Sequence, residues 1–411
     1  MIVKFFANLC RILVGVVLIF SGFSKAVDPL GSTYKFADYF HALHLDFMMP
    51  VALPLAILLN GAEFMIGIAL ITNTWMRFTA WMALIFMSFF TILTFILAIF
   101  NPVSDCGCFG DAMKLTNWQT FEKNLVFMVF TLAIFIYRRN FRPMFSSNGQ
   151  TMVAVAGVIM FSWFTWFCFQ HLPVIDFRPY KAGTHIPSQM IIPDGAPRDS
   201  FSTLLYYKKN GVVKEFTMEN YPWQDSTWQY DTIKHTLVKE GYKPPIHDFT
   251  ITTPDNQDIT ETVLNDSGYV FLAVVKKVEE ADEQGLRKLD SVYRFCTRTG
   301  KCRFIATTAS TSEMIDKYTK QYKLPFVFHT TDHTTLKTIV RSNPGLVLLK
   351  NATVLAMWSH NDIPELNDKQ TNIESLAATT WRVKAEFYMT LSLFLGLALV
   401  LAVLFIVFKK K

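Results

Sequence analysis

The sequence predicts an all-α membrane bundle, then an α/β domain outside the membrane, then a C-terminal anchor helix. Of the 411 residues, 51% are hydrophobic, 38 are phenylalanine and only 18% are charged. This composition is too apolar for an ordinary soluble enzyme. Between residues 269 and 360, strand-like apolar runs alternate with amphipathic helical patterns, which predicts a parallel α/β sheet.

Six apolar runs are long enough to cross a bilayer, whose hydrocarbon core of about 30 Å needs about 20 residues of helix. The first run has basic residues near its start, like a secretory signal peptide, but it offers no small-x-small cleavage site, so we expect it to be retained. The predicted spans are residues 5–23, 51–72, 78–100, 118–137, 151–169 and 387–408.

The basic residues near helix ends predict the topology. They lie on one side if both termini are cytoplasmic, and they are Lys4, Arg11, Arg77, Arg138, Arg139, Arg142 and Lys409 to Lys411. The loops 26–50 and 101–117 and a large segment, 171–384, then face the periplasm of a bacterial inner membrane. The net charge of +6 and the pI near 8.8 are therefore explained by basic residues at the cytoplasmic ends of the helices. The predicted partner is the lipid bilayer and not nucleic acid.

Two ionisable residues stand out in the first two helices: Lys25 just beyond the first predicted span and Glu63 inside the second. An ionisable group at membrane depth must face protein or water and is a functional candidate. Glu63 is a candidate proton donor or acceptor, and Lys25 a candidate binding residue. The alternative is that Glu63 holds helices together through a hydrogen bond, and the sequence leaves both readings open.

The loop "NPVSDCGCFGDAM" between the third and fourth spans carries Cys106 and Cys108. A zinc site is disfavoured, because only Asp105 and Asp111 are near and no histidine accompanies them, so no metal is predicted. A structural staple is also disfavoured, since a bridge between residues two apart closes almost no loop. A strained Cys-Gly-Cys disulfide exchanges readily, which favours a redox role for both cysteines.

These residues carry a family resemblance over about the first 140 positions. The pattern R-x3-G-x6-G-x2-K-x2-D-P on the first helix, the acidic residue of the second and "DCGCFGD" resemble the MauE/DoxX family of small membrane proteins. The resemblance implies a four-helix DoxX-like bundle, here residues 1–145, with a fifth helix at 150–170. For the MauE branch it also implies a role in methylamine utilisation, in maturation of methylamine dehydrogenase beside a thioredoxin-like partner that helps to form disulfides.

Residues 171–240 are predicted as an extended periplasmic linker, and residues 240–365 as a compact domain. "YVFLAVV" and "CRFIATT" are predicted strands, each followed by a helix, and "GLVLLKNATVLAMW" is a predicted strand pair. The preceding "PPIHDFTITTPDNQDIT" is similar to the hairpin that opens TlpA-like and peroxiredoxin-like domains. The order of elements resembles a thioredoxin fold.

This resemblance also locates a missing motif. Thioredoxin-like oxidoreductases carry Cys-x-x-Cys after the first central strand, but that position here is "KKVEEADE". Pro344 matches the proline, often cis, that lines their active site, and is a candidate binding residue. A fold without its nucleophile indicates binding or scaffolding.

Four further cysteines complete the set. For Cys296 and Cys302 we predict a structural disulfide, because the periplasm is oxidising. The alternative is an exchangeable pair, which the flanking basic residues would favour. Cys10 and Cys168 lie in spans as packed apolar residues.

Two classes of function remain. In the first, the protein is a membrane thiol/disulfide relay, with Cys106 and Cys108 exchanging electrons with a thiol protein or a quinone while the thioredoxin-like domain docks a periplasmic client. In the second, it is a non-enzymatic anchor that presents a redox-inactive binding module. The Cys-Gly-Cys favours the relay and the missing Cys-x-x-Cys favours the anchor, so the sequence alone does not decide whether the chain is an enzyme.

Overall fold

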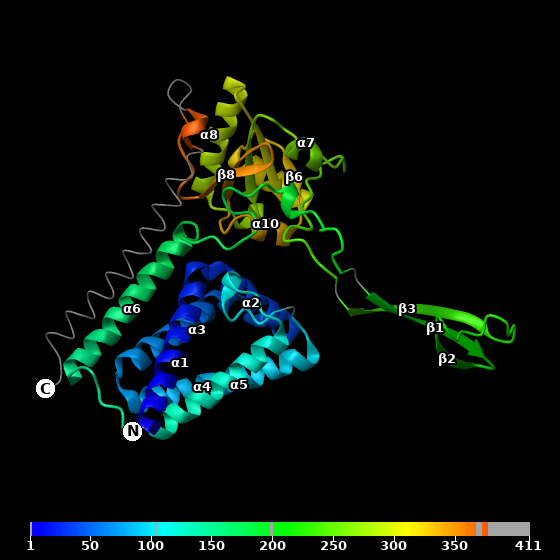
Figure 1. The fold of residues 1–411 in the computed structure, drawn as a ribbon. Helices are drawn as coiled ribbons and strands as arrows, with labels where there is room; N and C mark the ends of the chain where they lie inside the picture. Colours follow the sequence, from blue (N-terminus) through cyan, green and yellow to red (C-terminus); the bar gives the residue numbers. More distant parts are fainter. Residues whose placement is uncertain (1, 104, 198–199, 240, 367–371, 377–411) are drawn as a thin grey trace.

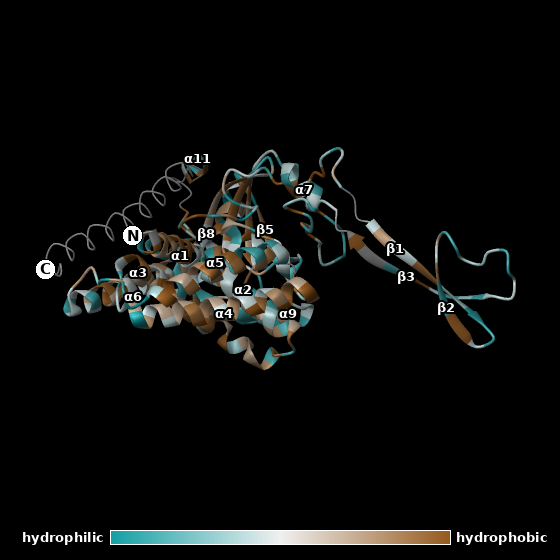
Figure 2. Cartoon of the chain, turned by 60° about the horizontal axis from the view of Figure 1, so that its bottom comes forward, coloured by the Kyte–Doolittle hydropathy of each residue, from teal (hydrophilic) through white to brown (hydrophobic). Residues whose placement is uncertain are grey.

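The computed structural model describes residues 2–103, 105–197, 200–239, 241–366 and 372–376. Within these ranges, five helices are long and apolar enough to cross a membrane. They are α1 (Ile2–Val27), α3 (Ala52–Thr72), α4 (Met76–Phe100), α5 (Asn117–Tyr137) and α6 (Ser147–Gln170), and apolar residues predominate along them (Figure 2). The chain is therefore a multi-pass membrane protein, as predicted. The sixth predicted span, 387–408, lies outside the described residues.

Helices α1 and α3 approach each other closely because glycines face across their contact. A Cβ added at Gly67 would lie 2.8 Å from the carbonyl oxygen of Gly15, and one added at Gly22 would lie 2.9 Å from the carbonyl oxygen of Asn60. No real side chain tolerates such distances from backbone atoms, so these positions require glycine.

The predicted loop 26–50 contains a helix that the hydropathy pattern did not reveal, α2 (Pro29–Ala42). Asp28 caps it by accepting a hydrogen bond from the Gly31 backbone N–H at 2.8 Å. Pro29 occupies its first turn, where the missing N–H costs nothing. Figure 1 shows α2 at the end of the bundle that faces the soluble domain.

The soluble domain is built on a five-stranded sheet in the order β6-β5-β4-β7-β8. β4, β5 and β6 are parallel, and β7 and β8 are antiparallel to their neighbours. The strands are β4 (Tyr269–Val275), β5 (Cys302–Thr308), β6 (Phe328–Thr330), β7 (Gly345–Lys350) and β8 (Thr353–Ser359). This order, with the Asn343–Pro344 peptide bond cis before β7, is that of a thioredoxin-like fold and confirms the predicted fold class.

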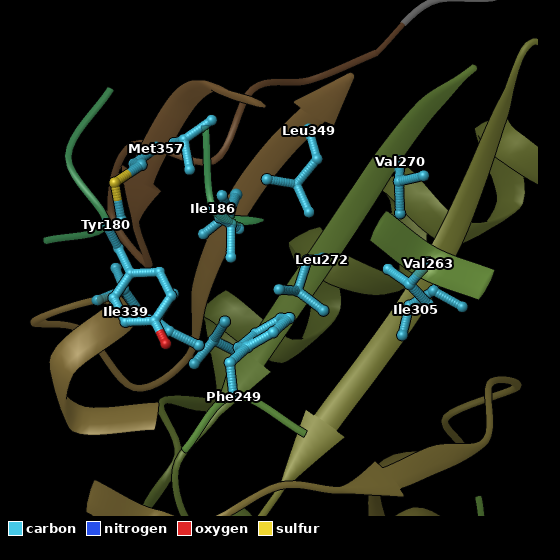
Figure 3. Close-up of a cluster of buried hydrophobic side chains, with 14 of the residues drawn as sticks. Tyr180, Ile186, Phe249, Val263, Val270, Leu272, Ile305, Ile339, Leu349 and Met357 are labelled. Carbon is cyan, nitrogen blue, oxygen red and sulfur yellow. The ribbon is translucent and has the colours of Figure 1, made fainter. Parts of the chain in front are cut away.

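Helices cover both faces of this sheet, so its central strand is buried on both sides. In β4, alternate residues such as Leu272 and Phe271 enter two separate cores, and Figure 3 shows the first of them. The covering helices are α7 (Thr260–Leu264), α8 (Glu283–Thr299), α9 (Ser312–Tyr322), α10 (His333–Ile339) and α11 (Ile373–Leu376). Tyr180 and Ile186 also pack in the first core, so this domain recruits residues from before 240.

A second, smaller sheet forms where the sequence predicted only an extended linker. It has the order β2-β1-β3 and is antiparallel throughout. Its strands are β1 (Ser200–Lys209), β2 (Val212–Thr217) and β3 (Gln229–Lys239). Figure 1 shows it projecting away from the rest of the chain. The aromatic and β-branched residues of these strands, such as Phe201, Tyr206 and Val212, were the available signal.

Candidate functional site

The two cysteines of the "DCGC" loop lie together at the end of the bundle. The Sγ atoms of Cys106 and Cys108 are 3.0 Å apart, and both are thiols in this structure. Gly107 lies between them with φ of +67°, a left-handed conformation that glycine adopts without strain. The Asp105 carboxylate accepts a hydrogen bond from the Gly107 N–H at 3.0 Å. The loop thus brings the sulfurs within reach of a disulfide after a movement of about 1 Å.

Side chains of α1 and α2 hold this loop in place. Tyr39 donates its hydroxyl hydrogen to the Cys106 carbonyl at 2.9 Å, and Ser21 donates to the Cys108 carbonyl at 2.5 Å. The Lys35 ammonium lies 2.8 Å from the Asp105 carboxylate. Three contacts from two helices therefore fix both cysteine backbones, which predisposes the sulfurs to a single geometry.

The surroundings make the two thiols chemically different. The hydrogen bond from Cys106 lowers the pKa of the Cys108 thiol to about 7; burial opposes this shift, and the positive charges of Lys123 and Lys25 assist it. The pKa of Cys106 is raised, because its proton is shared with the Cys108 sulfur and because it is buried. Near neutral pH, Cys108 is the sulfur that exists in part as thiolate, and thiolate is the nucleophilic form.

Lys25 and Glu63, predicted separately, form an ion pair between α1 and α3. Their side chains are 11% and 7% exposed, so each supplies the counter-charge that burial of the other requires. Next to them, the Asn60 amide donates to the Ser32 hydroxyl at 3.1 Å. The ion pair shows that Glu63 links two helices. It also lies in the same cavity as the cysteines, which leaves its proton-transfer role a proposal.

That cavity has a volume of about 860 Å³ and extends from the bundle interior to the soluble domain. Apolar residues of α1, α3, α4 and α5 form its deeper part, and α2 with α10 forms its outer part. Cys106 and Cys108 lie in its wall together with Lys25, Glu63 and Lys123. The thiol pair therefore lies in the wall of a cavity that reaches both the interior of the bundle and the soluble domain.

The soluble domain contacts the bundle beside the cysteine loop. Arg341, three residues before the cis proline, donates to the Asp28 carboxylate at 2.7 Å and to the Asp111 carboxylate at 2.9 Å. Asp28 caps α2, and Asp111 follows the Cys-Gly-Cys in the same loop. Arg341 was not selected from the sequence, although both aspartates belong to the quoted motifs. Its position three residues before Pro344 was an available signal.

The position that holds the exchange cysteines in thioredoxin-like oxidoreductases also contacts the bundle. It follows β4, and its first residue is Lys276, whose ammonium lies 3.1 Å from the Tyr34 hydroxyl of α2. Burial, together with the positive charges of Arg341 and Lys337, lowers the pKa of Lys276 to about 8. The face of the domain that lacks exchange cysteines therefore lies against α2, the helix that holds the cysteine loop through Tyr39 and Lys35.

The remaining cysteines lie apart from this site. Cys296 lies in the last turn of α8 and Cys302 begins β5. Each is a thiol, and a hydrogen bond between them raises the pKa of Cys296 and lowers that of Cys302. Their predicted disulfide stays a prediction. Cys10 and Cys168 are buried among apolar helix residues. Within the described ranges, no group of three or more His, Cys, Asp and Glu residues could hold a metal ion.

The fold and the loop together define a membrane bundle with a thiol pair, joined to a thioredoxin-like domain without exchange cysteines. The bundle is of the MauE type: residues 3–137 match the family model described as "Methylamine utilisation protein MauE", as the motifs predicted. Residues 201–240, the small sheet, match a domain of unknown function, DUF8463. No curated protein is significantly similar to the chain.

Solved structures similar to this chain include a secreted disulfide oxidoreductase from Mycobacterium tuberculosis, at 12% identity and a TM-score of 0.23, covering 34% of this chain and 96% of that one. A thiol peroxidase from Chromobacterium violaceum has 13% identity and a TM-score of 0.23, covering 34% of this chain and 85% of that one. These TM-scores are too low to support an argument, and the fold assignment rests on the strand order described above.

Proposed function

We propose that the protein is a membrane thiol/disulfide exchange protein that introduces disulfides into an envelope client through Cys106 and Cys108. The observation that carries the proposal is the pair of sulfurs 3.0 Å apart, in a loop that Arg341 ties to the thioredoxin-like domain. The bundle supplies the cysteines that this domain lacks. The MauE match supports a role in the maturation of an envelope protein, and this envelope protein would be the client.

The difference between the two thiols suggests the order of events. A client thiolate attacks Sγ of Cys106 in the disulfide form of the pair, and Cys108 leaves as a thiolate, because the thiol with the lower pKa is the better leaving group. The second client thiolate then attacks the client sulfur of this mixed disulfide and releases Cys106, which takes up a proton. The client gains one disulfide, and the cysteine pair gains two electrons.

The client is expected to reach the pair through the outer part of the cavity. Thr334, Lys337 and Arg341 of the thioredoxin-like domain line this part together with α2. The domain then acts as a docking wall and not as an exchange centre. If the chain lies with its N-terminus in the cytoplasm, as the basic residues predict, this end of the bundle faces the periplasm and its thiol proteins.

The test is to trap the mixed disulfide in native membranes. In the Cys108→Ala variant the pair cannot form its own disulfide, so the adduct forms by the reverse exchange: Cys106 attacks the disulfide of an oxidised client, and one client sulfur leaves as a thiolate. Because Cys108 is not there to resolve this mixed disulfide, we expect a covalent adduct on Cys106 that is visible on non-reducing gels and disappears with reductant. Cys10→Ala, a buried cysteine of α1, is the matched control and should give no adduct. If neither single variant of the pair gives an adduct, and the double variant matures envelope proteins normally, the exchange function is wrong.

A second candidate function is a non-enzymatic scaffold, and the small sheet favours it. This sheet leaves large apolar side chains open to solvent, among them Phe201 at 57%, Tyr230 at 57% and Trp223 at 71% exposed. Solvent-exposed apolar groups of this size are typical of surfaces that bind other proteins. Deletion of residues 200–239 separates the two functions, because a scaffold would lose partner binding while a thiol exchanger would keep its trapped adduct.

A further inference from the structure

The apolar part of the cavity leads from the cysteine pair into the membrane. Its walls include Leu55 and Leu59 of α3, Leu93 of α4 and Phe127 of α5. Two other wall residues, Leu58 and Phe89, are 69% and 56% exposed on the outside of the bundle. Because the outside of a membrane-spanning helix faces lipid, the cavity opens sideways between α3 and α4 into the hydrocarbon layer.

The inner end of this part is polar and positively charged. Lys25, Lys123 and Cys108 line it, and the Lys123 ammonium lies 4.4 Å from the centre of the Phe109 ring. Lys25 is already neutralised by Glu63. A ligand that fits must therefore combine an apolar tail with a head that accepts hydrogen bonds from ammonium groups, and the head must reach Cys108.

We propose that this part of the cavity binds a lipid-soluble quinone, which re-oxidises the cysteine pair. The inference rests on the proposed function, since a pair that has oxidised a client needs an electron acceptor. A quinone dissolves in the bilayer, its ring carries two carbonyl oxygens as hydrogen-bond acceptors, and its tail matches the apolar walls. The volume of about 860 Å³ lies within the range of about 300–1,000 Å³ that is usual for small-molecule sites.

The step balances without a further reactant. The two thiols of the reduced pair lose two electrons and two protons, and a bond forms between Sγ of Cys106 and Sγ of Cys108. The quinone takes up the two electrons and two protons and leaves as the quinol. Cys108, in part thiolate, is the sulfur that first donates electrons to the ring. The buried Lys25–Glu63 pair offers a site through which the protons pass to the quinone oxygens.

A phospholipid is the competing occupant, since it also carries a tail and hydrogen-bond acceptors. Unlike a quinone, a phospholipid carries a phosphate, whose negative charge would match Lys123. A phosphate cannot accept electrons from thiols. The cavity residues nearest the cysteines include both Lys25 and Glu63, and the carboxylate disfavours an anionic head. A neutral quinone ring therefore fits this end better.

The experiment uses the full-length protein in nanodiscs of neutral phospholipid and a short-tailed benzoquinone as the probe. Binding is measured by titration calorimetry against empty nanodiscs in the Cys106→Ser/Cys108→Ser variant, in which no thiol chemistry occurs. We expect saturable binding. Leu93→Trp, which fills the cavity, should weaken binding at least tenfold, and Leu59→Phe is a milder second filling variant. Ile92→Trp is the matched control, because Ile92 is the neighbour of Leu93 on α4, is 62% exposed and does not line the cavity.

A second measurement follows electron transfer in the reduced wild-type protein. One equivalent of quinone should yield one equivalent of quinol and a Cys106–Cys108 disulfide, identified by mass spectrometry of alkylated peptides. Absence of saturable binding, binding that Leu93→Trp and Leu59→Phe leave unchanged, or bound quinone that leaves the thiols reduced would each overturn the proposal. If the mixed disulfide with a client still forms in those cases, the exchange function stands and only the acceptor is wrong.

Discussion

Replacing Arg341 with methionine should release the soluble domain from the cysteine loop. The Arg341 side chain is 9% exposed, and its partners Asp28 and Asp111 are 13% and 26% exposed. Removing one partner of a buried ion pair costs about 3–5 kcal/mol, because the remaining charges stay desolvated. Asp111 keeps contact with water, so we take the lower limit of about 3 kcal/mol, which corresponds to roughly a 100-fold shift of the docking equilibrium.

The assay is the rate at which a bulky maleimide labels the cysteine pair in isolated membranes. When docking and undocking are fast, labelling tracks the undocked fraction, as it does for other probes of local opening. The rate for Arg341→Met should therefore rise on the order of 100-fold. Arg294→Met is the matched control, because Arg294 pairs with Asp290 on the exposed face of α8 and is 59% exposed. Such a surface pair contributes little, and the labelling rate should change by less than about twofold.

A labelling rate for Arg341→Met within about twofold of wild type, in a protein that still melts cooperatively, would refute the reasoning. It would mean that the domain does not cover the thiols, or that other contacts hold it. Asp111→Asn gives an independent check, because it removes only one of the two carboxylates. Its rate should fall between those of wild type and Arg341→Met.

Three further predictions concern reactivity, stability and topology. The rate of alkylation of Cys108 should rise about tenfold per pH unit and level off above a midpoint near pH 7, where its pKa lies. An unperturbed thiol has its midpoint near 8.5. A midpoint above pH 8 would contradict the hydrogen bond that Cys108 accepts from Cys106. If Cys296 and Cys302 form a disulfide, replacing both with serine should lower the free energy of unfolding by roughly 2 kcal/mol, and thiols that label without prior reduction would exclude the bridge. Reporter fusions at Asp111 should behave as periplasmic and those after Asn148 as cytoplasmic, and a cytoplasmic signal at Asp111 would remove the oxidising context assumed for every disulfide.

The membrane helices could be predicted from the sequence because each needs only a long apolar run, a local property. The strands of the thioredoxin-like sheet could be predicted too, since β4 is an uninterrupted apolar stretch and β5 is rich in apolar and β-branched residues. Helix α2 was missed for the opposite reason: it lies at the end of the bundle, it is not apolar throughout, and its start is marked only by the Asp28–Pro29 cap. The small sheet was missed because its strands follow Pro-rich, polar sequence and pack little against the rest.

The cysteine loop illustrates what sequence can and cannot supply about the site. Cys106 and Cys108 were selected as a close pair, because two residues of separation guarantee proximity. Lys25 and Glu63 were each selected, but their pairing depends on how α1 packs on α3. Arg341 lies 230 residues from Asp111 along the chain, and no periodicity or motif relates the two. Contacts of that kind arise only from the docking of separately folded parts.

The distance along the chain between Asp111 and Arg341 has a consequence for biosynthesis. A ribosome that adds about 5–20 residues per second takes roughly 10–50 s to make the intervening 230 residues. During that interval the cysteine loop has left the ribosome while the domain that will cover it does not yet exist. The nascent thiols therefore meet the oxidants and thiols of their surroundings before the finished protein can restrict access to them. Any disulfide formed with another protein in that window would have to be resolved before the domain can dock.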